Sequence, residues 1–400
     1  MENKGKRLKE ILMLDGAIPL HRTMLVPADK ASLERLLEIE DRNAVYPLDD
    51  LIGISGLPFK ATEAAVANIA KEGIRNPSYE RAAEVLNEKC FYNISPSQVK
   101  RITDYVGALV FTDDTKRAEE AKQFEGARID RRRCKDDVLY IEFDGSYYLE
   151  NIEDTKGCEW KECKIATAFK KSDMREWGND STEILKRDYV GIIGSSDEMK
   201  NHLLALAARN GLFETKTLVV ITDGAKWILP MVRRLFPHAV PILDKFHAKE
   251  NAGKFAMAVK RGKLQKKEYA DHLCDLIDKG DVTQLLKDLE KYKDFKQKGV
   301  VNFYDYVFRL QDCMHYDEYE ARGFLVGSGH IESTHRHVMQ DRMKCSGQHW
   351  NRMYGQGILS LKSRYEADKW DEVEALISND YREHRDLSMS SKNKVSEVES

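Results

Sequence analysis

Short runs of β-branched and aromatic residues stand out against the otherwise mixed pattern of this 400-residue chain. The run at 217–222 contains no charged residue, which is typical of a buried strand, and an Asp-Gly pair follows it at Asp223. The run at 138–143 has a similar form and is followed by an Asp-Gly pair at Asp144. In open α/β sheets, ligands bind outside the carboxyl ends of the strands. Two strands that each end in Asp-Gly can therefore place their carboxylates side by side.

The elements around these runs predict the fold class. Further strands are expected at 146–149, 163–169 and 240–243, and helices at 196–210 and 225–236. The order along the chain is then three antiparallel strands, a helix, a strand, a helix and a strand. This is the order of a ribonuclease H-like α/β fold, with a mixed sheet and acids at the ends of its first and fourth strands.

The pattern before this sheet predicts helices. Residues 1–111 are expected to form a helical N-terminal region, in which two short helices at 78–106 are joined as in a DNA-binding helix-turn-helix. Lys100 and Arg101 lie at the start of the second helix, where base edges would be read. A small helical bundle with a polar face fits the same pattern equally well. The charged segment 112–135 is expected to connect this region to the sheet domain.

A second helical region interrupts the sheet domain, because apolar residues keep a helical spacing from residue 245 to about 322. A Gly-rich loop then leads into a helix that carries Glu332. The last residues are rich in Ser, Lys and Glu, which is typical of disorder. The expected parts are a sheet domain made of 136–244 and 323–345, a helical insertion at 245–322, C-terminal helices at 346–383 and a disordered tail at 384–400.

Charge is distributed unevenly along the chain. The formal net charge of −3 gives no sign of a nucleic-acid-binding protein, but binding faces are local. Lys and Arg are frequent in 245–267, where Glu250 is the only acid, and in 333–365, where Asp341 is the only acid. Both basic segments follow candidate acids, which favours contact with the phosphates of DNA.

The cysteines and the apolar runs indicate a cytoplasmic protein that does not enter a membrane. The seven cysteines form no CxxC pair and no zinc-ribbon spacing, so reduced thiols are expected. The first residues lack the apolar run of a signal peptide, and no run reaches the length needed to span a membrane.

Three acids that converge on one end of a sheet suggest a magnesium site. Nucleotidyl transfer uses two divalent ions about 3.5–4 Å apart. Asp144 would bridge both ions, and Asp223 and Glu332 would each complete the coordination of one. The expected cofactor is Mg²⁺, with Mn²⁺ as a substitute. Taken singly, an Asp-Gly pair is more often a turn, and Glu332 would be an ordinary first-turn helix acid. Three such acids at the expected places of one topology favour a site.

Other residues are candidates for supporting these acids or for contacting DNA. Asp244 ends the fifth predicted strand and His247 lies three residues later. The structural alternative is a helix N-cap followed by a histidine in the first turn. Lys226 and His335 are further candidates for the supporting role, and Lys226 could equally be a solvated helix charge. The residues expected to bind DNA through their side chains are Lys100, Arg101, Arg336, Arg342 and Lys344.

Four motifs carry a resemblance to a known family: Asp144-Gly, Ile221-Thr-Asp-Gly-Ala-Lys-Trp-Ile, Leu243-Asp-Lys-Phe-His-Ala-Lys-Glu, and Gly327-Ser-Gly-His-Ile-Glu-Ser followed by Gln340-Asp-Arg-Met-Lys-Cys-Ser-Gly-x-x-Trp350. Over about 47–377 the chain resembles the DDE transposases of bacterial insertion sequences. The Kra-type elements and their relatives, akin to Mutator-like transposases, are the most similar group. Relatives often have a longer N-terminal region than this chain.

The resemblance implies a ribonuclease H-like core with a helical insertion between the second Asp and the Glu. It implies that Asp144, Asp223 and Glu332 are the Mg²⁺-binding triad, and that Asp244 and His247 form the group's (Cys/Asp)-x-x-His motif. The implied partners are the terminal repeats of an insertion sequence, target DNA and further copies of the chain. The expected function is therefore metal-dependent cleavage and strand transfer. The alternatives are an inactive or repurposed DNA-binding protein and a structure-specific nuclease on the same fold.

Overall fold

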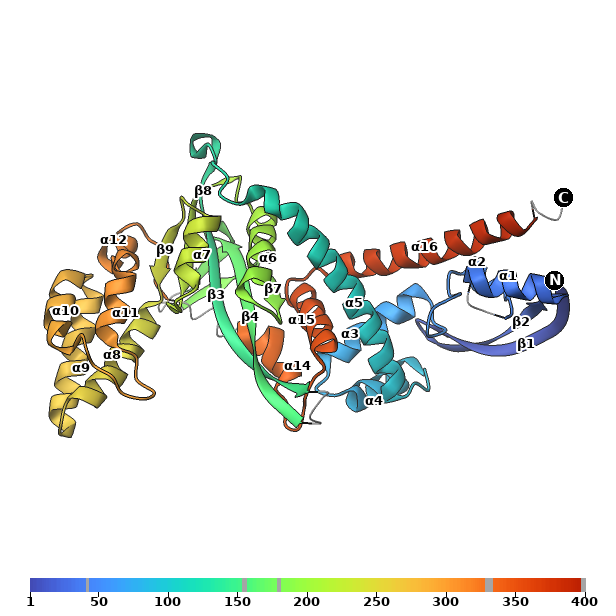
Figure 1. Cartoon of the computed structure of the whole chain (residues 1–400), viewed down its shortest axis with the longest axis horizontal. Helices are drawn as coiled ribbons and strands as arrows, with labels where there is room; N and C mark the ends of the chain where they lie inside the picture. Colours follow the sequence, from blue (N-terminus) through green and yellow to red (C-terminus); the bar gives the residue numbers. More distant parts are fainter. Residues whose placement is uncertain (41–42, 153–156, 178–180, 328–333, 397–400) are drawn as a thin grey trace. The chain divides into compact units, whose positions relative to one another are not determined.

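A computed structural model describes residues 1–40, 43–152, 157–177, 181–327 and 334–396 (Figure 1). The chain divides into two compact units. Unit 1 comprises Met1–Asp113 and Asp341–Ser400, and unit 2 comprises Asp114–Gln340. The division falls within one continuous helix, α5 (Pro96–Ala121), whereas the sequence places a connector at 112–135.

Unit 2 contains a five-stranded mixed sheet with the strand order β7-β4-β3-β8-β9 (Figure 1). β4 pairs antiparallel with β3 and β7, and β8 pairs parallel with β3 and β9. The predicted α/β class with a mixed sheet is therefore confirmed. The strands are β3 (Lys135–Ile152), β4 (Gly157–Lys170), β7 (Asp188–Ile192), β8 (Thr215–Thr222) and β9 (Val240–Leu243). A separate two-stranded ribbon consists of β5 (Met174–Trp177) and β6 (Ser181–Ile184).

The sequence predicts that the first long strand ends at Asp144, but in the structure it continues. β3 continues to Ile152 and forms a long antiparallel hairpin with β4, in which Asp144 pairs with Ile165. The residues that follow the Asp-Gly pair include Tyr147 and Tyr148, and aromatic residues favour the extended conformation. Asp144 therefore lies inside a strand, which excludes the interpretation of this Asp-Gly pair as a turn.

Helices connect the parallel strands and form the insertion. α6 begins with a capping box, because the Ser195 side chain accepts from the Glu198 amide while the Glu198 carboxylate accepts from the Ser195 amide. The helices of unit 2 after β7 are α6 (Ser196–Arg209), α7 (Ile228–Leu235), α8 (Lys245–Val259), α9 (Lys263–Asp278), α10 (Val282–Leu289), α11 (Phe303–Leu310) and α12 (Tyr316–Ala321). The predicted helical character of the insertion is thus present from α8 to α12.

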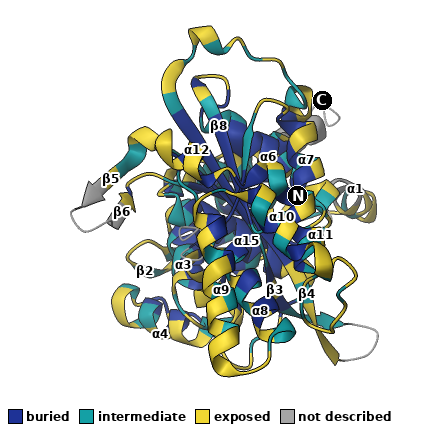
Figure 2. Ribbon diagram, turned by 90° about the vertical axis from the view of Figure 1, so that its left-hand side faces the viewer, coloured by how far each residue is buried: buried dark blue, intermediate teal, exposed yellow. Residues whose placement is uncertain are grey.

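The insertion and the sheet share one hydrophobic core. Ile221 and Leu243 from the strands belong to the same buried cluster as Phe255 of α8 and Phe303 and Val307 of α11. Figure 2 shows buried residues concentrated on the strands and on the helix faces that meet them. The insertion is therefore packed onto the sheet rather than tethered beside it.

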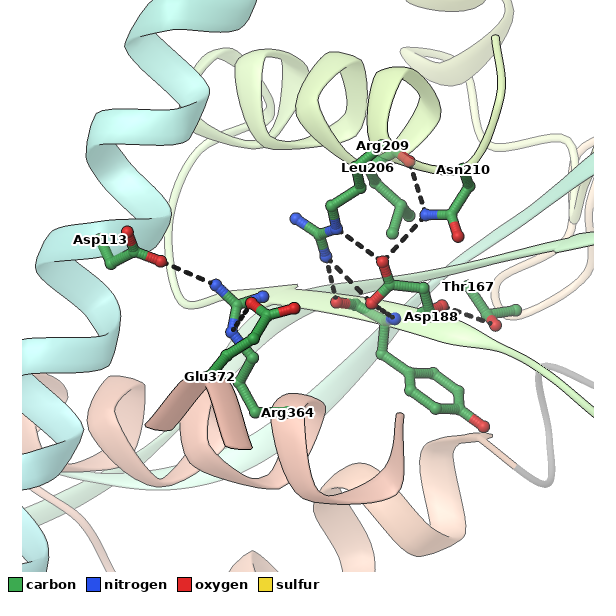
Figure 3. A network of polar contacts seen from close by, with 9 residues as sticks. Asp113, Thr167, Asp188, Leu206, Arg209, Asn210, Arg364 and Glu372 are labelled. Atoms are coloured by element: carbon green, nitrogen blue, oxygen red, sulfur yellow. Dashed lines mark hydrogen bonds and ion pairs between the residues drawn. The ribbon is translucent and has the colours of Figure 1, made fainter. Parts of the chain in front are cut away.

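A buried ion pair attaches the edge strand β7 to α6 (Figure 3). Asp188 is 2% exposed, and its carboxylate accepts from Arg209 Nε at 2.6 Å and from Asn210 Nδ2 at 2.9 Å. Thr167 on β4 donates to the Asp188 carbonyl at 3.1 Å. A second pair in the same figure, within unit 1, joins Arg364 to Asp113 at 3.0 Å. Both arrangements fix elements of the scaffold.

Unit 1 begins with a β-hairpin, so residues 2–26 of the predicted helical N-terminal region are strands instead. Most residues of β1 are exposed. A strand that is exposed on both faces over most of its length needs no alternation of apolar and polar residues, so the sequence gives little signal for β1. The elements are β1 (Glu2–Met13), β2 (Gly16–Val26), α1 (Lys30–Glu40), α2 (Pro47–Leu51), α3 (Glu63–Arg75) and α4 (Tyr79–Cys90), followed by α5.

The C-terminal part of unit 1 is helical, with α14 (Asp341–Met343), α15 (Arg352–Glu366) and α16 (Trp370–Ser396). α16 extends through residues that the sequence predicts as a disordered tail from 384. The segment 371–396 contains neither Gly nor Pro, so nothing in it terminates the helix. Among the described residues, no helix combines the length and the apolar character that a membrane span requires.

Candidate functional site

The register of the parallel strands brings three aspartates into line. Phe143 pairs with Thr222, and Thr222 pairs with Leu243. The residue that follows each of these three is an aspartate: Asp144, Asp223 and Asp244. The Asp244 amide donates to the Thr222 carbonyl at 2.8 Å, which continues the ladder to this point. Because neighbouring strands lie about 4.8 Å apart, the three acids form a row across β3, β8 and β9.

The ionised form of Asp223, at the centre of this row, is disfavoured by its surroundings. Burial raises the pKa of its carboxyl above the usual value of 3.8, and the charges of Asp144 and Asp244 raise it further. The Ala225 amide, which donates to Asp223 Oδ1 at 2.9 Å, acts in the opposite direction. A carboxylate held near two others in a partly buried position is typical of a site that receives a cation.

Asp244 is both a helix N-cap and a neighbour of the other acids, with His247 in the first turn of the helix. Asp244 is 1% exposed and caps α8, because its Oδ1 accepts from the His247 amide at 3.0 Å. The Nδ1 atom of His247 lies 3.4 Å from the other carboxylate oxygen. The close contact with the Asp244 carboxylate raises the pKa of His247, as do the charges of Asp144 and Asp223, while burial lowers it. The N-cap is thus also part of the acid row.

Two residues of the insertion hold the backbone that follows β8. The Tyr306 hydroxyl donates to the Asp223 carbonyl at 2.9 Å, and the Arg309 guanidinium donates to the Gly224 carbonyl at 2.8 Å. Gly224 has φ +83°, and a Cβ at this position would lie 2.6 Å from Leu310 Cδ1. The glycine is therefore required both by its conformation and by the closeness of α11.

Tyr306 lies in the helical insertion that the sequence predicts at 245–322, and its spacing alone does not indicate this contact. The available signal was its hydroxyl, because a buried tyrosine usually needs an acceptor. Tyr316 repeats the arrangement, since its hydroxyl donates to the Leu243 carbonyl at 3.0 Å, one residue before Asp244. The insertion thereby fixes the ends of both β8 and β9.

The chain returns from the insertion to the same place. The Lys245 amide donates to the Val326 carbonyl at 2.9 Å, so the residues that precede the Gly-rich loop lie at the start of α8. The third predicted acid, Glu332, lies outside the described residues, which resume at Thr334. The acid row seen here thus consists of aspartates from three strands, with the chain towards Glu332 leaving from its edge.

A π-helical segment, η6 (His335–Gln340), follows. The sulfur of Met339 lies 3.6 Å from Cys163 Sγ, and Cys163 pairs with Ser146, two residues beyond Asp144. Residues two apart on a strand share a face, so this segment packs on the same face of the sheet as Asp144. Single π-helical turns are frequent at functional sites. His335 begins the segment, and Arg336 is exposed on it.

The predicted lysine after Asp223 is exposed. Lys226 lies in a turn that precedes α7, whereas the sequence predicts a helix that already includes it. Trp227 beside it contacts the ring of Phe143 edge-on at 5.1 Å and has the ammonium group of Lys164 5.5 Å from its ring centre. These contacts anchor the segment between β8 and α7.

The predicted DNA-binding residues of unit 1 have different surroundings from those expected. The Lys100 ammonium pairs with Asp104 and lies 3.8 Å from the centre of the Tyr354 ring. Arg101 is exposed and donates to the Pro58 carbonyl at 3.3 Å, while Lys344 is exposed after α14. The two helices of the predicted helix-turn-helix are present as α4 and the start of α5.

Arg342, which the sequence predicts to contact DNA, is buried. Its side chain is 1% exposed, and its guanidinium donates to the Gly73 carbonyl at 3.0 Å and to the Pro77 carbonyl at 3.4 Å. The rings of Tyr79 and Trp350 lie 4.5 and 4.9 Å from its guanidinium carbon. Arg342 therefore stabilises the packing of unit 1 and is removed from the residues expected to contact DNA.

The donor set suits a hard divalent cation, because carboxylate oxygens are the ligands that Mg²⁺ prefers. The described residues alone contain no group of three or more His, Cys, Asp or Glu side chains close enough to hold a metal ion. The carboxylates of Asp144 and Asp223, with unfavourable charge between them, fit part of such a set. The seven cysteines form no disulfide, and none of them belongs to the acid row.

Comparison with known protein families finds a match over most of the chain. The model of an uncharacterised protein family, UPF0236, matches residues 36–374. The chain belongs to this family. The matched part of this UPF0236 chain contains the acid row, the whole insertion and the segment that returns from it. The curated proteins include no match to the chain.

Proposed function

We propose that this UPF0236 chain is a DNA transposase that cleaves and joins DNA with the help of a divalent metal. The observation that carries the proposal is the register that aligns Asp144, Asp223 and Asp244 at one end of the mixed sheet. The strand order, with an antiparallel side and a parallel side that meet at β3, supports a ribonuclease H-like core. The motif resemblance supports transposition among the chemistries of that fold.

In this proposal Asp144, Asp223 and Glu332 hold Mg²⁺ or Mn²⁺. When bound, such ions would supply activation of the attacking oxygen and stabilisation of the leaving oxygen of the phosphodiester. The raised pKa of Asp223 is consistent with this assignment, because burial and then the neighbouring carboxylates disfavour its charge until a cation is present. The position of the segments on either side of 328–333 supports Glu332 as the third ligand.

The surrounding residues have positioning roles. Tyr306 and Arg309 hold the two carbonyls that follow β8 and thereby fix the direction of the Asp223 carboxylate. Asp244 orients His247 toward the acid row, so that an imidazolium would offset part of its negative charge. Arg336, exposed on η6, is a candidate for contact with a DNA phosphate. The terminal repeats of an element, target DNA and a second copy of the chain are the proposed partners.

The test uses purified protein, Mg²⁺ or Mn²⁺, and duplex DNA that carries the sequences flanking the chain's own gene. Wild-type protein should nick the ends and join them to a target, and Asp223→Asn should do neither. Asp271→Asn is the matched control, because Asp271 is an exposed acid of α9. Cleavage without joining would assign a nuclease instead. Binding without cleavage by wild-type protein would assign a repurposed DNA-binding protein.

A further inference from the structure

The helical insertion carries a group of cations whose charges are not neutralised. Between the end of α8 and the first turns of α9 the sequence is Lys260-Arg-Gly-Lys-Leu-Gln-Lys-Lys267, with five cations and no acid. Gly262, with φ +81°, makes the turn between the two helices. We call residues 260–267 the insertion tip.

The cations at the other end of α8 are paired. Lys245 contacts Asp278 at 3.1 Å and Glu320 at 2.7 Å, and Lys249 contacts Asp278 at 2.6 Å. These pairs also show that the start of α8 meets the end of α9, so the two helices are antiparallel. The insertion tip therefore lies at the end of the hairpin that points away from Asp244.

The insertion tip itself has no such partners. Lys260 lies 4.1 Å from the centre of the Tyr269 ring. The other four cations form no ion pair with any residue that the structure describes, and Arg261, Lys263 and Lys267 are exposed. Four unpaired cations within seven residues produce a local positive potential that a polyanion would neutralise.

The distance between the acid row and the insertion tip favours duplex DNA as this polyanion. α8 has 15 residues, and at about 1.5 Å per residue it spans about 22 Å from Asp244 to the insertion tip. The acid row and α8 belong to the same compact unit. In a duplex with about 3.4 Å per base pair, 22 Å corresponds to about 6–7 base pairs. A duplex whose phosphodiester lies at the acids can therefore reach the tip with its flanking backbone.

We infer that the insertion tip binds the phosphate backbone of duplex DNA about 6–7 base pairs from the bond that the acid row cleaves. This inference rests on the proposed function for the location of the cleaved bond, whereas the contact itself requires only DNA binding. The tip is thus a second contact that sets how the duplex lies across the acids.

The experiment compares two triple variants of the full chain. Arg261→Ala/Lys263→Ala/Lys267→Ala removes three tip cations. Lys287→Ala/Lys296→Ala/Lys298→Ala removes three exposed lysines from another part of the same insertion, where acids are interspersed. Binding to a labelled 30-base-pair duplex that carries the gene-flanking sequence is measured without divalent metal over a range of salt concentrations. Circular dichroism and thermal melts check that both variants are folded.

Each neutralised phosphate contributes about 0.9 to the slope of log affinity against log salt concentration. The tip variant should therefore lose up to about 2.7 from this slope, and the control variant less than about 1. On duplexes that end about 3 base pairs from the cleaved bond on the tip side, the tip variant should bind as the wild-type protein does.

Equal slopes for the tip variant and the wild-type protein would overturn the inference, as would an equal loss in the control. A change in oligomeric state with an unchanged slope would assign the tip to contact between copies. The Asp223→Asn protein separates the two proposals. If it binds with the full slope and wild-type protein does not cleave, the proposed function fails and the tip assignment stands.

Discussion

The strand ends of unit 2 and the helix pair α4–α5 of unit 1 differ in how far their charges are satisfied. At the strand ends, Asp223 is partly buried near two other acids, and its pKa is raised. In unit 1, Lys100 pairs with Asp104, and the buried Arg342 donates to two carbonyls. Charges that are left unfavourable within the fold indicate a site for an external partner, whereas charges that are already paired stabilise the scaffold.

Asp223→Asn should give the largest effect. Loss of a metal ligand should lower the rate of cleavage by about 10³-fold or more, since electrostatic and metal contributions of several kcal/mol are lost. In metal-free buffer at neutral pH the same change should raise the melting temperature. The ionised carboxylate destabilises the folded chain at pH values above its raised pKa, and the neutral amide does not.

Calorimetry across pH tests the sign of this effect. The stabilisation by Asp223→Asn should shrink as the pH falls through the raised pKa of Asp223, because the wild-type carboxyl is then protonated. Adding Mg²⁺ should raise the melting temperature of the wild-type protein more than that of the variant. A variant that melts below the wild-type protein in metal-free buffer would contradict the view that this charge is unsatisfied.

Arg342→Ala should show the opposite behaviour. Loss of the guanidinium leaves the Gly73 and Pro77 carbonyls without this donor and opens a space between Tyr79 and Trp350. We expect a loss of about 2–3 kcal/mol in unfolding free energy. Denaturant titration of the variant measures this, with Lys344→Ala as the exposed control. A change in the salt dependence of DNA binding at full stability would return Arg342 to the DNA-contacting residues.

Gly224→Ala tests whether the backbone that follows β8 requires a glycine. The methyl group meets Leu310 and the backbone must keep φ +83°, so a loss of about 1–3 kcal/mol in stability is expected, together with reduced cleavage. Gly253→Ala is the control. Gly253 lies within α8 and has open space where the new methyl group would lie, so the change should stabilise the protein by about 0.5–1 kcal/mol. Both values come from denaturant titration.

Tyr306→Phe should have the smallest effect. It removes one hydrogen bond to the Asp223 carbonyl, which is worth about 1 kcal/mol, and leaves the ring in the core. We expect about a tenfold lower turnover with an unchanged DNA affinity, measured in single-turnover and binding assays. Tyr304→Phe on the same helix, where the hydroxyl does not contact the strand end, should leave turnover unchanged. Equal effects of both changes would remove Tyr306 from the positioning residues.

The sequence predicted the parts of the molecule whose signals are local. The apolar runs before Asp223 and Asp244 become β8 and β9, and the helical spacing after Lys245 becomes α8. Strand register is not a local property, so the alignment of the three aspartates required the structure. The π-helical turn of η6 likewise has no pattern that distinguishes it from an α-helix.

The errors arose where a distant partner decides the role of a residue. Arg342 lies in a basic segment that is typical of DNA binding, but its guanidinium donates to the Gly73 carbonyl, 269 positions away along the chain. The hydroxyl of Tyr306 reaches the Asp223 carbonyl over 83 positions. The sequence predicts separate strands at 138–143 and 146–149, whereas pairing with β4 makes them one strand that continues to Ile152.

The hydrogen bond between the Lys245 amide and the Val326 carbonyl has a topological consequence. Because the helical excursion leaves and re-enters the sheet domain at adjacent points, its length is not coupled to the distance between the elements that flank it. Exposed turns between its helices can be gained or lost without any change in the register of β3, β8 and β9. In evolutionary terms the insertion can vary in length, while the shared core and the hydrogen bonds of Tyr306, Arg309 and Tyr316 tie its packing to the geometry of the acids.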